Sequence, residues 1–401
     1  MHAWHAALSF LVAAGVAALV TPLAARLARA LHVVDLPRIG GLTQRETPLL
    51  GGVAIFVAIV VATAIFMPHF ITLPRTARSA GERVSVNTWG LIVGGALITL
   101  VGAIDDRLDL RWWVKLVGQV AAAIIAVRAG AIVTDVTIPF LGAHQFPHAG
   151  GVLTVIWLVA LMNVVNFTDG VDGLAAGLCT IDGIAFAIIA LNLGVAGAAI
   201  LAAITAGAAL GFLVHNFHPA SIFMGDAGSN LLGYMLGVTA VAGSLKTNAV
   251  VALLVPLVIL AIPLLDTSFV VAKRLKYRRA PWARDANHFH HRFARIGFSQ
   301  RKTVAYLYAW SAVLAGLAVA MRLLPYHPQN THYDWLWVGV LIGIGVVALA
   351  ASVYLVVVLE IVKLGRLRLI DLRRTDPAAP DAEIRARAAH DVETGEFTRV
   401  R

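Results

Sequence analysis

The sequence predicts an all-α polytopic membrane protein, and three observations support this fold class. Hydrophobic residues make up 59% of the 401 residues and charged residues only 13%, whereas a soluble domain carries about 25% charged residues. Apolar runs recur along the chain, and many reach the length of about 20 residues that a helix needs to cross a bilayer. The Lys and Arg residues gather in alternate connections between these runs, as they do in the cytoplasmic loops of membrane proteins.

Eleven apolar segments qualify as transmembrane helices. The N-terminal sequence MHAWHAALSFLVAAGVAALV has no Lys or Arg before its apolar run, and Arg26 and Arg29 come after this run, which is the reverse of a secretory signal peptide. We therefore expect a retained first helix with its N-terminus outside. Because the number of spans is odd, the C-terminus is then cytoplasmic. The predicted spans lie near residues 4–29, 48–68, 88–104, 113–130, 150–164, 174–192, 195–215, 228–244, 248–271, 303–323 and 335–361.

The distribution of positive charge sets the predicted orientation. With the N-terminus outside, the inner connections and the C-terminal tail hold 26 of the 32 Lys and Arg residues, and the outer connections hold six. An excess of this kind is typical of cytoplasmic loops. We therefore attribute the net charge of +10 to topology and to contact with anionic membrane lipid, and we expect no nucleic-acid partner.

The end of the chain differs in composition from the rest. Residues 371–401 mix charges of both signs and include Pro377 and Pro380. Such a segment is expected to be a mobile cytoplasmic tail, although the part from Asp381 to His390 has a helical composition. The sequence thus divides into a multi-span membrane domain, residues 1–370, and a charged tail, residues 371–401.

Five acidic residues stand at the ends of long apolar runs, where a charge is costly and a functional role is the default hypothesis. They are Asp105, Asp106, Asp169, Asp172 and Asp226. The first two are adjacent, so their repulsion must be relieved by a cation or a shared proton. Clustered carboxylates suit a hard divalent cation such as Mg²⁺. A solvated loop between helices is the simpler alternative for the adjacent pair.

A second polar segment continues one of these runs with a spacing of three residues. Asn163, Asn166 and Asp169 would span about 120° of a helix, so they can face one cavity. Gly170 and Gly173 are expected to end the helix and to let the backbone approach a ligand. A calcium loop of the EF-hand type fits poorly, because its glutamate and flanking helices are missing.

Two further segments carry groups that suit a nucleotide diphosphate. Asp226 lies between Gly225 and Gly228 and is a candidate metal ligand, and Phe223 is a candidate stacking surface for a base. Simple packing beside the membrane explains Phe223 equally well. The most basic loop contains His288, His290, His291 and Arg292. With a single cysteine in the chain and no HExxH pattern, zinc is not supported, and these donors fit phosphate oxygens better.

All of these polar segments fall on the predicted cytoplasmic side. Together they fit Mg²⁺-dependent chemistry on a diphosphate at the inner membrane face. A secondary transporter or lipid flippase would also have many spans and intramembrane acids, but it would be expected to show repeat symmetry and polar groups near the midplane. A non-catalytic membrane scaffold would not require so many polar motifs.

The chain resembles the polyprenyl-phosphate N-acetylhexosamine-1-phosphate transferase family in five ordered segments: DLPRIGGLTQRETPLLGGVAIF, GAIDDRLDL, NVVNFTDGVDGLAAG, NFHPASIFMGDAGSNLLG and NHFHHRFARIGFSQR. The resemblance runs from about residue 30 to residue 310. It implies transfer of a sugar 1-phosphate from a UDP-N-acetylhexosamine to undecaprenyl phosphate, with release of UMP. It also implies ten or eleven spans in a bacterial inner membrane and a Mg²⁺ cofactor, for which Mn²⁺ can substitute, and it leaves a homodimer open.

Two segments resemble the N-acetylglucosamine-1-phosphate branch of the family more than the peptidoglycan branch. Pro48 to Gly52 resembles the Pro-Arg-Leu-Gly-Gly segment of the first branch, with Leu49 in place of the Arg, and His288 to His291 resembles its His-x-His-His. This branch starts teichoic acid, O-antigen or related glycan synthesis. UDP-N-acetylmuramoyl-pentapeptide and other UDP-sugars, such as an N-acetylfucosamine, remain alternative donors.

The resemblance also implies a role for each motif residue. Asp226 would be a Mg²⁺ ligand with Asp106 near the metal, and Asp105 would deprotonate or position the lipid phosphate. The nucleotide pocket would be shaped by Asn166, Asp169 and Asp172, with Phe223 stacked on uracil. The diphosphate or the sugar would be held by His288, His290, His291 and Arg292.

Overall fold

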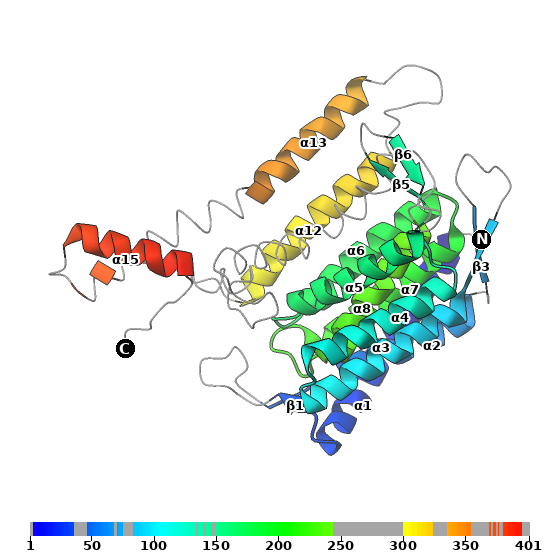
Figure 1. The fold of residues 1–401 in the computed structure, drawn as a ribbon, viewed down its shortest axis with the longest axis horizontal. Coiled ribbons are helices and arrows are strands. Elements are labelled where there is room, and N and C mark those ends of the chain that lie inside the picture. The colour runs from blue at the N-terminus through cyan, green and yellow to red at the C-terminus, as the bar shows by residue number, and fades with distance from the viewer. Residues whose placement is uncertain are drawn as a thin grey trace. The chain divides into compact units, whose positions relative to one another are not determined.

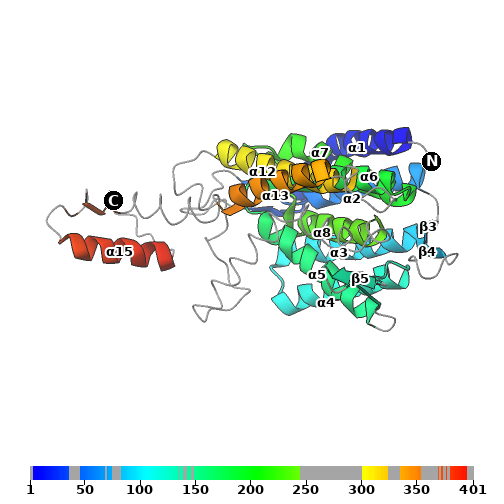
Figure 2. The same cartoon turned by 90° about the horizontal axis from the view of Figure 1, so that it is seen from above.

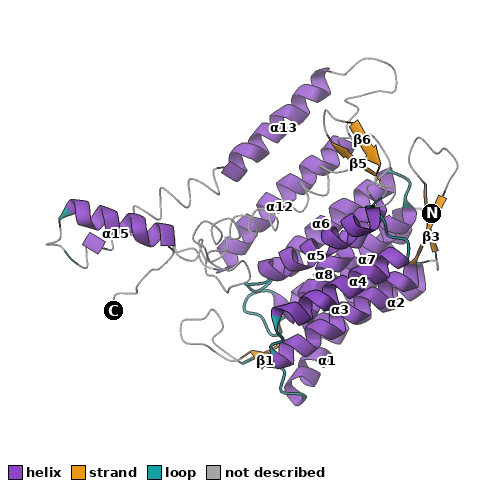
Figure 3. Cartoon of the chain, viewed as in Figure 1, coloured by secondary structure: helices purple, strands orange, loops and turns teal. Residues whose placement is uncertain are grey.

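The computed structural model describes residues 3–35, 46–67, 70–74, 83–133, 135–138, 142–145, 149–243, 300–323, 335–353, 369, 372–373, 376 and 380–394. Within these ranges the protein is almost entirely helical, as Figure 3 shows in purple. Helices occupy ten of the eleven ranges that were predicted to span the membrane. The predicted span at 248–271 lies outside the described residues.

The ten helices begin and end within a few residues of most of the predicted boundaries. They are α1 (Ala3–Ala30), α2 (Gly51–Phe66), α3 (Thr88–Leu108), α4 (Trp112–Arg128), α5 (Gly150–Thr168), α6 (Leu174–Asn192), α7 (Ala196–Asn216), α8 (Gly225–Gly243), α12 (Gln300–Leu323) and α13 (Trp335–Val353). Six of the described helices, namely α1, α3, α5, α6, α7 and α12, are long and apolar enough to cross a membrane. The protein is therefore an all-α, multi-pass membrane protein.

The chain divides into two compact units. The first unit contains α1 to α8 and the part of α12 from Ser311 onward, and the second contains the start of α12, α13 and the C-terminal segment. Helix α8 is the centre of the first unit, because it packs against α2, α3, α5, α6 and α7. Figure 2 shows α8 between α6 and α3. Tyr234 of α8 is fully buried, and its hydroxyl donates to the carbonyl oxygen of Leu91 in α3 at 3.0 Å.

Helix α1 shows how the unit meets the bilayer. Its small residues Ala13 and Ala17 are fully buried, and α1 packs mainly on α7. Small side chains at such a contact let two helix backbones approach closely, as in other membrane proteins. On the outer side of α1, Leu11 and Leu19 are 62% and 77% exposed. Large exposed apolar side chains suit a surface that faces lipid.

Three short antiparallel hairpins connect the helices of the first unit, and the sequence did not predict them. They pair β1 (Val34–Asp35) with β2 (Thr47–Pro48), β3 (Phe70–Pro74) with β4 (Arg83–Asn87), and β5 (Asp135–Ile138) with β6 (Gly142–Gln145). Figure 1 shows β3, β5 and β6 at the end of the unit where α1 begins, and β1 at the opposite end. The hairpins thus mark the two ends of the helix bundle.

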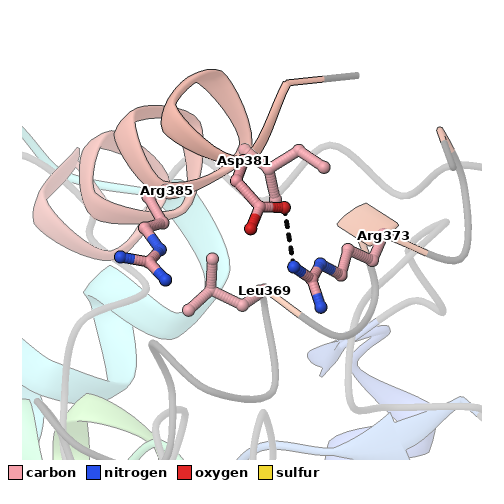
Figure 4. Close-up of a pocket in the computed structure, with 5 residues that line it drawn as sticks. Leu369, Arg373, Asp381 and Arg385 are labelled. Carbon is pink, nitrogen blue, oxygen red and sulfur yellow. Dashed lines mark hydrogen bonds and ion pairs between the residues drawn. The ribbon is translucent and has the colours of Figure 1, made fainter. Parts of the chain in front are cut away.

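The C-terminal segment contains a helix, α15 (Asp381–Thr394). This helix includes Asp381 to His390, the part whose composition was helical. Arg373 donates to the Asp381 carboxylate at 2.6 Å near the start of this helix (Figure 4). These two residues line a pocket with Leu369, Ile384 and Arg385. The pocket contains none of the site residues that were predicted from the sequence.

Candidate active site

Three of the polar segments singled out in the sequence meet at one end of the first unit. Asp105 and Asp106 lie in the last turn of α3, and Asn166 lies in the last turn of α5. Asp226 lies in the first turn of α8. Because consecutive helices run in opposite directions, these helix ends lie together at the end of the bundle marked by β1 (Figure 1). The prediction that the segments share one side is therefore consistent with the arrangement of the helices.

The centre of the cluster is a lysine held between two acids. The amino group of Lys115, in the first turn of α4, lies 2.5 Å from Oδ2 of Asp105 and 2.7 Å from Oδ2 of Asp226. The Asp105 side chain is only 6% exposed, whereas those of Asp226 and Lys115 are 26% and 32% exposed. Two carboxylate oxygens thus converge on one cationic atom at the edge of the bundle.

Asp106 has a different environment from its neighbour. Its Oδ1 accepts the backbone N–H of Asp226 at 2.7 Å, and its Oδ2 accepts that of Ala227 at 3.3 Å. A carboxylate at this position satisfies N–H groups that have no partner within the helix and interacts favourably with the helix dipole. Asp106 therefore caps α8 and fixes the first turn that carries Asp226.

Two glycines allow α3 and α8 to approach so closely. Gly225 has φ of +68°, and a Cβ atom there would collide with the Asp106 carboxylate. A Cβ atom on Gly102 would collide with the backbone of Ala227. A larger residue at either position would separate the cap from the helix it caps.

Asn166 and Asn163 extend the cluster along α5. The Asn166 amide donates to Oδ1 of Asp226 and to the hydroxyl of Ser229, both at 2.9 Å. Asn163 donates to Gln119 of α4 at 2.8 Å, and Gln119 donates to Asn230 of α8 at 2.8 Å. The two asparagines thus lie on the side of α5 that faces α4 and α8, as their spacing predicted. Asn163, Gln119 and Asn230 form a chain of amide hydrogen bonds that runs from α5 through α4 to α8.

Asp169 follows the last residue of α5. Its backbone N–H still bonds to Val165 and Asn166, so the helix ends there, just before Gly170 as expected. Burial, together with the negative charges of Asp226 and Asp172, raises the pKa of Asp169 to about 8. The Asp169 carboxyl therefore holds a proton more readily near neutral pH than an ordinary aspartate does.

Asp172 fastens the loop between α7 and α8. One carboxylate oxygen, Oδ2, lies 2.7 Å from Nδ1 of His218 and accepts the backbone N–H of Ala220 at 3.1 Å. Asn216, which is buried, adds a second connection. Its side chain accepts the N–H of Gly173 at 2.9 Å and donates to the carbonyl of Ile222 at 3.0 Å. The loop that leads to Asp226 is thus held to the loop that carries Asp172.

Phe223 lies immediately before α8 and pairs with the chain at the start of α2. Its N–H donates to the carbonyl of Pro48 at 2.8 Å, and its carbonyl accepts the N–H of Gly51 at 3.0 Å. The backbone of Phe223 is therefore fixed beside Asp226, and its side chain is partly exposed. His288, His290, His291 and Arg292 lie outside the described residues.

The described acids suit a cation that takes most of its ligands from substrate and water. No group of three or more His, Cys, Asp or Glu side chains in the described ranges could hold a metal ion by itself. Mg²⁺, however, usually binds through one or two carboxylates together with waters and substrate phosphates. The oxygens of Asp105 and Asp226 that converge on the Lys115 ammonium fit this mode of binding.

Comparison with known proteins identifies the family. The model of glycosyl transferase family 4 matches residues 88–244, the part from α3 to α8. The probable undecaprenyl-phosphate N-acetylglucosaminyl 1-phosphate transferase of Bacillus subtilis is 31% identical over 320 residues, which cover 78% of this chain and 84% of that protein. The chain belongs to the polyprenyl-phosphate N-acetylhexosamine-1-phosphate transferase family. The nearest branch is that of the N-acetylglucosamine 1-phosphate transferases.

Two further members of this transferase family have similar identity to the chain. The decaprenyl-phosphate N-acetylglucosaminephosphotransferase of Mycobacterium leprae is 34% identical over 363 residues, which cover 85% of this chain and 89% of that protein. The phospho-N-acetylmuramoyl-pentapeptide-transferase of Desulforamulus reducens is 33% identical over 352 residues, which cover 84% of this chain and 98% of that protein. Relatives of both branches therefore cover most of the chain.

Some residues of this cluster were not identified from the sequence. In the sequence, Lys115 contributes only to the charge count that sets topology, and Gln119 lies inside a predicted span. Their distance in sequence from Asp226 gave no sign that they contact the residues of α8. The position of Lys115 on the helix that follows the paired acids was the available signal, because a cation there can neutralise them.

Proposed function

We propose that this protein transfers N-acetylglucosamine 1-phosphate from UDP-N-acetylglucosamine to undecaprenyl phosphate. The products would be UMP and a lipid-linked sugar diphosphate that begins the synthesis of a cell-envelope glycan. The observation that carries the proposal is the similarity over most of the chain to relatives named for this transfer to undecaprenyl or decaprenyl phosphate. The acids and the lysine at one end of the bundle supply groups that suit a diphosphate substrate.

We propose Mg²⁺, or Mn²⁺ in its place, as the cofactor, with Asp226 as the principal protein ligand. Oδ2 of Asp105 is the second candidate oxygen, because it shares the Lys115 ammonium with Asp226. The sequence-based assignment of Asp106 as a ligand stays a prediction, since both oxygens of Asp106 accept backbone N–H groups. When bound, such a cation neutralises negative charge on a diphosphate.

The remaining residues would bind and orient the substrates. We assign the uridine to the side of the cluster formed by Asp169, Asp172 and Phe223, where two loops are joined by hydrogen bonds. Asp105, which is almost fully buried, is assigned to the lipid phosphate as a base or positioning group. The diphosphate or the sugar is assigned to His288, His290, His291 and Arg292. Positioning and charge neutralisation supply most of the catalysis in phosphoryl transfer.

We further propose that the site faces the cytoplasm of a bacterium. In this arrangement eleven helices cross the inner membrane, with the N-terminus outside and the C-terminus inside. The Lys and Arg count of the connections supports this orientation. A site at one end of the bundle could take a water-soluble nucleotide sugar from the cytosol and a lipid phosphate from the bilayer.

A panel of donors tests the reaction. Purified protein would be incubated with undecaprenyl phosphate, Mg²⁺ and either UDP-N-acetylglucosamine, UDP-N-acetylmuramoyl-pentapeptide or UDP-N-acetylfucosamine, and UMP release would be measured. We expect UMP mainly from UDP-N-acetylglucosamine. Release mainly from the muramoyl-pentapeptide donor would assign the activity to the peptidoglycan branch of the family. No UMP from any donor would contradict the proposal.

A further inference from the structure

Four of the six carboxylate oxygens of Asp105, Asp106 and Asp226 accept hydrogen bonds from neutral donors. Oδ1 of Asp105 accepts the N–H of Leu110 at 2.7 Å, and Oδ1 of Asp226 accepts the Asn166 amide at 2.9 Å. Asp106 uses both of its oxygens at the start of α8. Among the contacts of these three described acids, one oxygen of Asp105 and one of Asp226 are thus left for a cation.

Both of these oxygens are occupied by the same amino group. Nζ of Lys115 lies 2.5 Å from the Asp105 oxygen and 2.7 Å from the Asp226 oxygen. A divalent cation bound to the same pair would lie only a few ångströms from this ammonium, and charges of like sign repel strongly at that distance in a partly buried site. This repulsion opposes the binding of both cations to the same pair of oxygens.

We propose that Lys115 is the counter-ion of the metal-free site, and that a divalent cation must displace its ammonium from Asp105 and Asp226. The proposal rests on the proposed function only in that the cation binds Asp226. The lysine is well suited to such an exchange, because its charge is carried on a flexible four-carbon stem and its side chain is partly exposed. Lys115 therefore prevents repulsion between the acids before the cation arrives and limits how tightly the cation binds.

Manganese binding to the purified full-length protein tests this competition without measuring turnover. Free Mn²⁺ would be followed by electron paramagnetic resonance as the ion is titrated into wild type, Lys115→Met and Arg107→Met. We expect Lys115→Met to bind Mn²⁺ about tenfold more tightly, because the ion no longer has to displace the Lys115 ammonium. A tenfold change in affinity corresponds to about 1.4 kcal/mol. Arg107→Met is the matched control, because Arg107 is an exposed cation in the last turn of α3. It should change the affinity less than about twofold, since exposed charges are screened.

Equal or weaker Mn²⁺ binding by Lys115→Met would overturn the inference, as would an equal gain in Arg107→Met. Asp226→Asn separates this failure from that of the proposed site. If Asp226→Asn binds Mn²⁺ as wild type does, the cation lies elsewhere and both proposals about it fail. If binding needs Asp226 but Lys115→Met does not tighten it, the competition alone is wrong and the proposed reaction is unaffected.

A measurement on wild type keeps the test valid should Lys115→Met not fold. Amine acylation with a water-soluble reagent would be quantified by mass spectrometry at Lys115 and, as a reference, at the exposed Lys302. Displacement predicts that Mn²⁺ raises the labelling of Lys115 severalfold relative to Lys302. Unchanged or reduced labelling of Lys115 would show that the ammonium stays between the acids.

Discussion

The three acids nearest the start of α8 differ in what their oxygens contact. Asp106 accepts two backbone N–H groups, whereas Asp105 and Asp226 each present an oxygen to Lys115. A carboxylate that caps a helix contributes to stability whether or not a substrate is present. The adjacent residues Asp105 and Asp106 therefore have separable roles, although their sequence context is the same.

Substitution of Asp106 should affect stability more than substitution of Asp226 does. Asp106→Leu removes both acceptors of the cap, which is worth about 1 kcal/mol or somewhat more, so the thermal midpoint of the purified protein should fall. Asp106→Asn keeps one acceptor, so its thermal midpoint should fall less. Asp226→Asn should keep its midpoint and lose its metal-dependent activity. A midpoint for Asp106→Leu equal to that of wild type would show that the cap contributes nothing.

Asp169 should make stability depend on pH. Its pKa is raised from 3.8 to about 8 in the folded protein, so the folded state holds a proton that the unfolded state has released across this interval. Stability from this group is complete below about pH 4 and is lost as the pH rises to about 8. Wild type should therefore lose thermal stability relative to Asp169→Asn between pH 5 and pH 8, measured without divalent cation. A constant difference between the two proteins would contradict the shifted pKa.

The sequence identified the acids of the cluster but not their partners. Acids at the ends of apolar runs are conspicuous because of their cost, and helix directions placed them together. The cap made by Asp106 and the bridge made by Lys115 depend on the close approach of α3, α4 and α8. Such contacts between distant segments have no local pattern.

At the scale of helices, a proline in α1 explains an unusual contact with α7. Pro22 has no N–H, so the carbonyl of Ala18 lacks its partner within the helix. Nε2 of His215, in the last turn of α7, lies 2.9 Å from this carbonyl and must be the donor. His215 also accepts the N–H and the hydroxyl of Ser221 through its backbone carbonyl. The residue thus connects α1 to the loop that leads to Asp226.

This contact predicts that Pro22→Ala compensates for the loss of His215. His215→Leu leaves a carbonyl without a partner, at a cost of about 1–3 kcal/mol, and should lower the thermal midpoint. In a Pro22→Ala background the restored N–H bonds to Ala18, so the same substitution should cost much less. The two single variants and the double variant form a cycle that isolates this coupling. An equal loss in both backgrounds would mean that the His215 ring stabilises the protein by other contacts.

The helices themselves were largely predictable, because the thickness of the bilayer sets the length of an apolar run. The predicted helix boundaries are wrong where polar residues continue a helix beyond its apolar run. α3 extends to Leu108, α5 extends to Thr168, and α8 begins at Gly225, each beyond the predicted apolar run. Hydrogen bonds of Asn166 and Asp106 to α8 compensate for the cost of these polar turns. The hairpins escaped prediction because their strands are only two to five residues long.

At the scale of the molecule, the helix ends separate into two groups. The end with β3, β5 and β6 carries connections without an acidic cluster among the described residues, and the opposite end carries Asp105, Lys115 and Asp226. This separation agrees with the expectation that a single side of the membrane holds the site. The Lys and Arg count then predicts which side it is.

Cysteine labelling tests that orientation. Cys179 is the single cysteine, so Cys179→Ala gives a cysteine-free background. In it, Ser85→Cys would report on the β4 end and Arg107→Cys on the end with the site. With a membrane-impermeant maleimide, we expect Ser85→Cys to be labelled in intact bacteria whose outer membrane has been made permeable, and Arg107→Cys only after lysis. The reverse pattern would place the site outside.

In the proposed reaction, the phosphate attached to the sugar moves with it to the lipid. The most direct measurement uses UDP-N-acetylglucosamine that carries radioactive phosphorus in the β-phosphate, together with undecaprenyl phosphate and Mg²⁺. We predict that the label passes into the organic phase as the lipid-linked sugar diphosphate, and that an equal amount of unlabelled UMP appears in water. Label that remains in water as UDP while the sugar alone reaches the lipid would contradict the account.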